Sequence, residues 1–120
     1  MIEAFFMAIS PSYLFYMTIG VLLGLVVGTL PGLTATMGTA LLVPFTFGLP
    51  TGEGIAMLGG LYVCAMFSDA IPACLVNTPG TPAAMATGFD GHPMVKQGRG
   101  QEAIVAACFG SALGTIFGAI

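Results

Sequence analysis

Two short segments place a helix-breaking Pro-Gly pair beside hydroxyl side chains within apolar sequence. Residues 28–34 read Gly-Thr-Leu-Pro-Gly-Leu-Thr, and residues 77–82 read Asn-Thr-Pro-Gly-Thr-Pro. Proline in a helix interior lacks an N–H donor and costs about 3 kcal/mol, and the glycine after it permits backbone angles that other residues resist. In hydrocarbon an opened backbone is tolerated only where it is buried in protein or lines a watery cavity. Each segment is therefore a candidate binding site.

A new helix is predicted to begin within the second segment. Thr81 is a suitable N-cap and Pro82 suits the first helical position, and we expect Gly88 or the Asp90-Gly91 turn to end this short helix. Unpaired N–H groups at a helix start attract anions, and exposed carbonyls attract small cations. One such break is commonly only a kink or an interfacial loop, so these residues alone leave the substrate open. The residues predicted to bind substrate are Pro31, Gly32, Thr34, Asn77, Thr78, Pro79, Gly80 and Thr81.

Asp69 is an ionisable residue inside an apolar run. Such a residue is costly in a membrane and is a functional candidate by default. We expect Asp69, with Asn77, to bind a coupling Na⁺ or to carry a proton. The alternative is a position near the membrane interface, because Pro72 is able to end the helix close by.

The remaining polar residues are interpreted as structural. Glu53 lies in the turn after Pro50 and is expected to be solvated, and His92 lies in a Gly-Pro turn with no second metal ligand nearby. An intramembrane hydrolase with Ser68 or Ser111 as nucleophile lacks a histidine or lysine base in an apolar block. We therefore expect no enzyme, no catalytic residue, no metal site and no cofactor beyond the coupling ion. The cysteines form no CxxC pair and are interpreted as packed thiols: Cys64, Cys74 and Cys108.

Composition identifies a membrane protein. The 120 residues are 57% hydrophobic and only 6% charged, with a net charge of −3, and the mean hydropathy is +1.01. A soluble domain carries about 25% charged residues, and a nucleic-acid binder needs a basic face. Both classes are excluded. The start of the chain has no cationic stretch, which disfavours a cleavable signal peptide.

The apolar blocks predict an all-α integral membrane fold. They cover about residues 13–49, 54–76 and 103–120 of a single transmembrane domain, residues 1–120. None alternates with period two, so a polytopic helical bundle with Pro-Gly-broken helices is expected. Lys96 and Arg99 place the loop at about 89–102 on the cytoplasmic side by the positive-inside rule. The apolar run that closes the chain, residues 103–120, has no polar tail, which predicts that the sequence is incomplete.

Glycine spacing predicts close helix packing at two places. A glycine falls on every fourth residue in each, so that the glycines line one helix face. The two sets are Gly20, Gly24, Gly28 and Gly32, and Gly110, Gly114 and Gly118.

From about Ser12 to its end the chain resembles the large membrane subunit of the tripartite tricarboxylate transporter (TctA) family. The resemblance rests on motifs in order: the glycines leading into Leu30-Pro31-Gly32-Leu33, then Asn77-x-Pro79-Gly80-Thr81-Pro82, then Asp90-Gly91-x-Pro93-Met94-x3-Gly98. It implies an N-terminal fragment from one half of a two-repeat carrier in the bacterial inner (plasma) membrane. It also implies cation-gradient-driven symport of citrate-like carboxylates, with a small membrane subunit and a periplasmic solute-binding protein as partners. The alternative is a structural or assembly membrane subunit without its own transport site.

Overall fold

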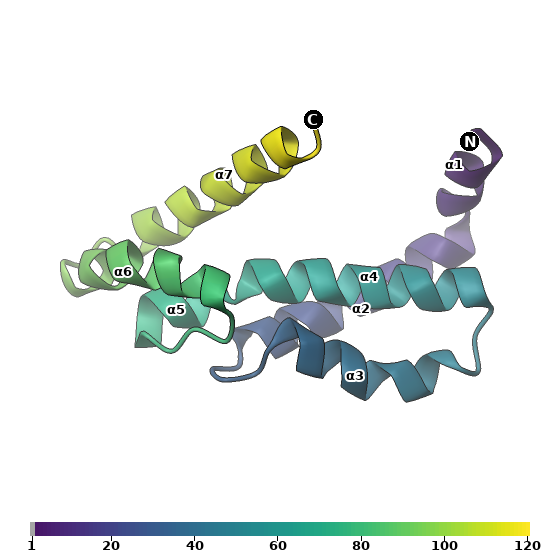
Figure 1. Ribbon diagram of the computed structural model, residues 1–120, viewed down its shortest axis with the longest axis horizontal. Coiled ribbons are helices and arrows are strands. Elements are labelled where there is room, and N and C mark those ends of the chain that lie inside the picture. The colour runs from purple at the N-terminus through teal and green to yellow at the C-terminus, as the bar shows by residue number, and fades with distance from the viewer. Residues whose placement is uncertain (1) are drawn as a thin grey trace.

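Seven helices make up the computed structural model, which describes residues 2–120 (Figure 1). No strand occurs in that range, so the predicted all-α fold is confirmed. The first helix lies before the first predicted apolar block and was not expected. The helices are α1 (Ile2–Ala8), α2 (Pro11–Thr29), α3 (Ala35–Thr46), α4 (Thr51–Ser68), α5 (Ala70–Val76), α6 (Pro82–Lys96) and α7 (Gly100–Gly118).

Three of these stretches are long and apolar enough to cross a bilayer: Pro11–Thr29, Thr51–Val76 and Gly100–Gly118. The second combines α4 and α5 across a junction at Asp69. Large apolar side chains such as Phe15, Leu22 and Val63 are exposed on the surface of these helices. An apolar exterior of this kind is what lipid requires of a helical membrane protein.

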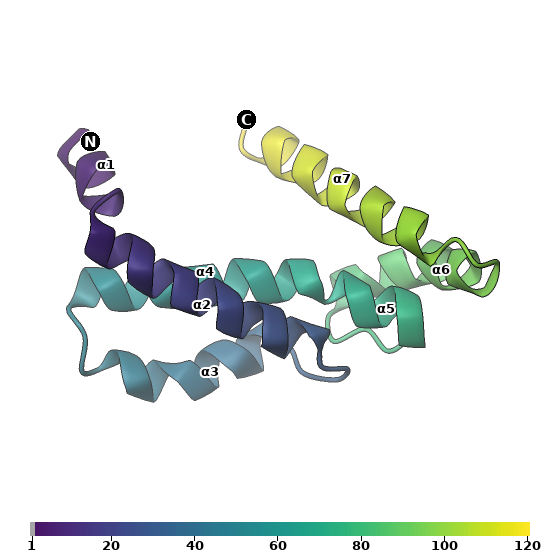
Figure 2. The same ribbon diagram turned by 180° about the vertical axis from the view of Figure 1, so that it is seen from behind.

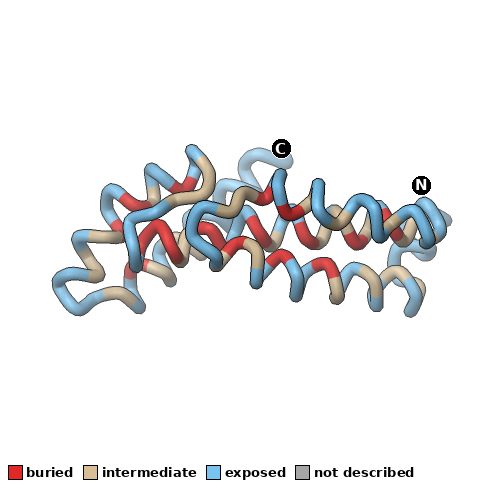
Figure 3. Tube along the Cα trace, turned by 90° about the horizontal axis from the view of Figure 1, so that it is seen from below, coloured by how far each residue is buried: buried red, intermediate tan, exposed pale blue. Residues whose placement is uncertain are grey.

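The glycines of α2 form its interface with α4, as predicted. Gly20, Gly24 and Gly28 are the buried residues of α2. A Cβ added to Gly28 would lie 2.5 Å from the Ala65 carbonyl oxygen, so only glycine allows this approach. Figure 2 shows α2 crossing α4, and the buried residues in Figure 3 follow the two facing helices.

The second glycine set finds no packing partner within residues 2–120. A Cβ added to Gly110, Gly114 or Gly118 would have no neighbouring atom within 4 Å. Ala103 is the only buried residue of α7, which packs on α5 and α6 and extends away from the other helices (Figures 1 and 2). The packing prediction therefore holds for the three glycines within α2. It is not met by Gly32, where a Cβ would have no neighbour within 4 Å, nor by the glycines of α7.

Helix α6 is longer than predicted. It passes Gly88 and the expected Asp90-Gly91 turn and ends at Lys96, so the prediction of a short helix is wrong. The reason is tertiary: a Cβ on Gly91 would lie 3.3 Å from the Cys74 Cβ, which shows how closely α6 packs on α5. His92 is inside α6, not in a turn, and its Nδ1 lies 3.0 Å from the Cys74 carbonyl oxygen.

Of the predicted loop at 89–102, residues 97–99 lie outside helices. Arg99 in this turn hydrogen-bonds Glu102, with 2.9 Å between Nε and Oε2. This hydrogen bond and the charge of Glu102 raise the pKa of the exposed Arg99 guanidinium above its usual value. Acidic neighbours contribute little to the positive-inside rule, so Glu102 does not change the expected orientation. The cytoplasmic placement of this turn stays a prediction.

The helices fall into two groups. Helices α2, α3 and α4 pack together, and α5, α6 and α7 form the second group. Figure 1 shows the two Pro-Gly segments at the junction between these groups.

Glu53, expected to be solvated, lies half-buried in the first turn of α4 and accepts a hydrogen bond from the Ser12 hydroxyl.

Candidate functional site

The first break separates α2 from α3. Gly32 adopts a φ of 88°, in the left-handed region that favours glycine. Thr34 then caps α3, because its Oγ1 accepts a hydrogen bond from the Met37 N–H at 3.1 Å. The Thr34 hydroxyl keeps its own hydrogen available to donate. The break that the sequence predicts here is confirmed.

The second break separates α5 from α6. Helix α5 ends at Asn77, which has a φ of 57°, a left-handed conformation that Asn tolerates better than most residues. Thr81 is the N-cap of α6 and Pro82 is its first residue, as predicted. The Thr81 Oγ1 accepts from the Ala84 N–H at 3.4 Å.

Asp69 joins the α4–α5 junction to this second break. Its side chain is buried, with the residue 2% exposed. The Gly80 N–H donates to Oδ1 at 2.8 Å, and the Thr81 hydroxyl donates to Oδ2 at 2.6 Å. Sequence reasoning singled out Asp69 but missed these contacts, because hydrogen bonds across 11 and 12 residues leave no trace in helical periodicity. Whether Asp69 also binds a coupling ion stays a prediction.

The two breaks meet at Gly80. A Cβ added to Gly80 would lie 2.5 Å from the Leu33 carbonyl oxygen and 3.1 Å from Asp69 Oδ1. The backbone of the second break therefore rests on that of the first, with a buried carboxylate beside the contact. Two segments whose closest predicted members, Thr34 and Asn77, are 43 residues apart thus belong to one region of the fold.

The predicted binding residues differ in exposure. Pro31, Gly32, Asn77 and Thr78 are exposed, whereas Thr34, Pro79, Gly80 and Thr81 are half-buried. A Cβ on Gly32 would have no neighbour within 4 Å, so this part of the first break is open. The structure therefore groups Gly80 and Thr81 with Asp69 and leaves Pro31 and Gly32 apart from them.

The charge balance of this region is unusual. Both groups that donate to the Asp69 carboxylate, the Gly80 N–H and the Thr81 hydroxyl, are neutral. The two cations of the chain, Lys96 and Arg99, lie at and beyond the far end of α6. Helix dipoles, hydroxyls and backbone N–H groups are therefore the favourable contacts that residues 77–84 offer an anion.

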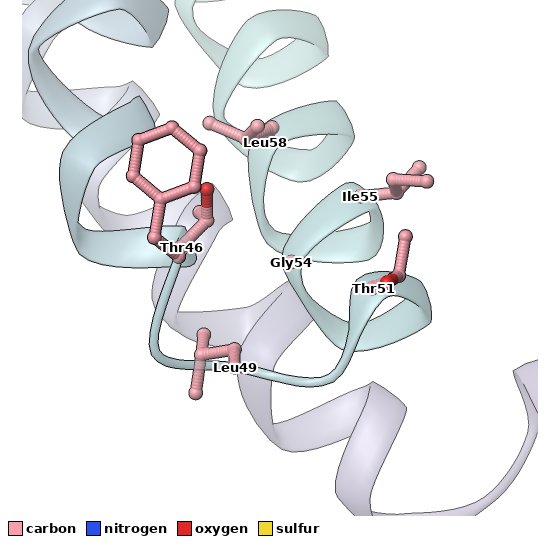
Figure 4. Close-up of a pocket in the computed structure, with 7 residues that line it drawn as sticks. Thr46, Leu49, Thr51, Gly54, Ile55 and Leu58 are labelled. Atoms are coloured by element: carbon pink, nitrogen blue, oxygen red, sulfur yellow. The ribbon is translucent and has the colours of Figure 1, made fainter.

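A pocket of about 250 Å³ lies elsewhere, at the connection between α3 and α4 (Figure 4). Its lining is mainly apolar, with the hydroxyls of Thr46 and Thr51 as polar groups. It contains none of the residues of the two breaks. We therefore place the candidate site at the breaks, where polar backbone is exposed within apolar helices.

Long apolar helices, glycine-mediated contact and two broken helices define the class of this molecule: it is a multi-pass helical membrane protein. The chain belongs to the tripartite tricarboxylate transporter TctA family, which matches residues 14–120.

Two curated relatives match most of this chain, as the family does. An uncharacterised 52.8 kDa protein of Agrobacterium vitis is 36% identical over 104 residues, which are 87% of this chain and 21% of the relative. An uncharacterised protein of Methanocaldococcus jannaschii is 34% identical over 107 residues, 87% of this chain and 26% of the relative. The chain thus spans about a fifth to a quarter of the relatives it matches. No solved structure matches it significantly.

Proposed function

We propose that this chain is part of the membrane subunit of a secondary transporter that takes up tricarboxylates or related carboxylates such as citrate. The observation that carries the proposal is the contact between the two helix breaks, where Gly80 rests on the Leu33 carbonyl. Broken helices that face each other within a membrane bind anionic groups at their helix starts and small cations at their free carbonyls. Family membership supports the same function.

In this proposal the exposed side chains of the breaks contact the substrate. Asn77 and Thr78 are exposed beside the start of α6, and Thr34 caps α3 with a hydroxyl hydrogen still to donate. The Gly80 N–H and the Thr81 hydroxyl are engaged by Asp69 in this conformation. They shape the second break and become substrate donors only if Asp69 releases them.

A coupling cation offsets the substrate charge. No cationic side chain occurs in the apolar blocks, since both cations lie between residues 96 and 99. A polyanion that leaves water in such surroundings needs a favourable opposite charge. We propose that Na⁺ or H⁺ enters with the substrate by symport, near Asn77, and that its gradient drives uptake.

The proposed setting follows from the family name. A tripartite transporter has two further components, which we propose to be a small membrane subunit and a periplasmic solute-binding protein. The proposed location is the bacterial inner membrane. The rival proposal is an assembly subunit, in which the glycine face of α2 only packs helices.

Replacing Gly80 separates transport from assembly. In the full-length carrier with its partner subunits, Gly80→Val is expected to lower uptake of radiolabelled citrate by about tenfold or more, because the new side chain separates the two breaks. Copurification of the partner subunit should stay at the wild-type level. The matched control is Gly59→Val, where a Cβ meets nothing within 4 Å and uptake should change less than about twofold. Loss of copurification before any loss of uptake supports the assembly subunit instead.

A further inference from the structure

We propose that Asp69 is a positioning residue: its carboxylate holds the second break against the first, in the shape that the carboxylate substrate meets. This inference rests on the proposed transport function. It assigns Asp69 a role through Gly80 and Thr81 and not through direct contact with the substrate.

The geometry of the two hydrogen bonds supports a positioning role. Consecutive residues, Gly80 and Thr81, each donate to a different oxygen of one carboxylate. Two bonds to one rigid planar group fix both the position and the orientation of the segment. The separations of 2.8 Å to Oδ1 and 2.6 Å to Oδ2 lie within the range of well-formed hydrogen bonds.

Little else restrains the segment between α5 and α6. The N–H groups of Asn77 and Thr78 both reach the Pro72 carbonyl oxygen, the latter at 3.5 Å. These bonds restrain the start of the segment, whereas Asp69 restrains its end. The hydrogen bond to Oδ1 holds the Gly80 backbone at the place where a Cβ would lie 2.5 Å from the Leu33 carbonyl oxygen, so the carboxylate fixes the segment where it contacts the first break.

The positioning role and the coupling-ion role make different demands on Asp69. A positioning residue needs acceptors of the right shape, which the oxygen of Asn supplies for the Gly80 N–H. The Asn amide is also able to donate to the Thr81 hydroxyl. A ligand for Na⁺ or a proton carrier needs the charge itself, which Asn lacks. Asp69→Asn therefore separates the two roles without a change in side-chain size.

Hydrogen exchange on the purified full-length carrier tests the positioning role without transport. We expect Asp69→Ala and Thr81→Val to speed exchange of the amides of residues 77, 78, 80 and 81 by about tenfold. Asp69→Ala removes both hydrogen bonds that hold the segment, and Thr81→Val removes one of them. Asp69→Asn and Thr81→Ser should stay within about threefold of wild type, because they keep the bonding groups. The matched control is Ser68→Ala, a buried neighbour whose polar contact is the Cys64 sulfur at 3.8 Å. It should leave this exchange unchanged.

Uptake kinetics supply the second readout. With radiolabelled citrate and the partner subunits present, Asp69→Ala should raise KM about tenfold, as the misplaced segment loses substrate contacts. Asp69→Asn should keep KM and the half-saturating cation concentration within about threefold of wild type. Should Asp69→Ala fail to fold, Thr81→Val and Asp69→Asn still decide the question.

Two results overturn the inference. One is unchanged exchange at residues 77–81 in both Asp69→Ala and Thr81→Val. The other is an Asp69→Asn carrier with wild-type exchange but no cation-dependent uptake, which assigns Asp69 the charge-bearing role of a coupling-ion ligand. If wild type takes up no citrate or other carboxylate, the proposed function fails, and the exchange experiment still decides whether Asp69 positions the segment.

Discussion

At the scale of single residues, Asp69 is distinguished from the other acidic residues by burial. Glu3, Asp90 and Glu102 are exposed and Glu53 is half-buried, whereas Asp69 is 2% exposed. A buried carboxylate is tolerated only with good hydrogen-bond partners, and the second break supplies both of them. The same break requires glycine at position 80 because a backbone carbonyl occupies the space of a side chain.

Glycine is required at the α2–α4 contact for a similar reason. A Cβ at Gly24 would lie 2.9 Å from the Leu61 Cα and closer still to the Leu61 carbonyl oxygen. Because backbone atoms are unable to yield as a flexible side chain does, Gly24→Ala is expected to lower the free energy of unfolding by about 1–3 kcal/mol.

Thermal unfolding of the full-length carrier in detergent measures this loss. Gly59→Ala on α4 is the control, since open space surrounds that position. It should be neutral or stabilising by roughly 0.5–1 kcal/mol, because Ala is a better helix former than Gly. Equal stability of the two variants is incompatible with a glycine-mediated α2–α4 contact.

At the scale of helices, a helix start and a helix end differ in how far local sequence predicts them. Both α3 and α6 begin at a threonine cap, Thr34 and Thr81, after a Pro-Gly pair. Proline chemistry and capping preferences predict these starts from local sequence. The end of α6 was not predictable in this way, because Cys74 of α5 offsets the helix-weakening effect of Gly91. The packing of another helix decides where α6 stops.

The cap at Thr34 gives a prediction at this scale. Thr34→Ala removes the acceptor of the Met37 N–H and is expected to cost about 1 kcal/mol in the stability of the first turn of α3. Hydrogen exchange at residues 35–38 should then be about fivefold to tenfold faster. Thr39→Ala, which removes only a hydroxyl bonded to the Thr36 carbonyl oxygen within the helix, is the control and should leave exchange there unchanged. Identical exchange in both variants contradicts the assignment of Thr34 as the N-cap of α3.

At the scale of the whole molecule, composition and local breaks were sufficient to predict a helical membrane protein. They were insufficient to bring the breaks together, because the contact between Gly80 and Leu33 depends on how α4, α5 and α6 pack. The open face of α7 shows the same limit: identical glycine spacing leads to packing in α2 and to an uncovered surface in α7. Spacing predicts a face that permits close packing, and the tertiary structure decides what covers it.

The most direct test of the central claim is to measure carboxylate uptake that is driven by an imposed cation gradient. Radiolabelled citrate is added outside vesicles that contain the full-length carrier with its partner subunits. Uptake is measured under an inward Na⁺ gradient, an inward proton gradient, or neither. The account predicts accumulation with at least one gradient, and a fall to background when ionophores remove both, because the apolar blocks of this chain hold no cationic side chain beside the proposed site. Equal accumulation without either gradient, or no accumulation under any condition, contradicts it.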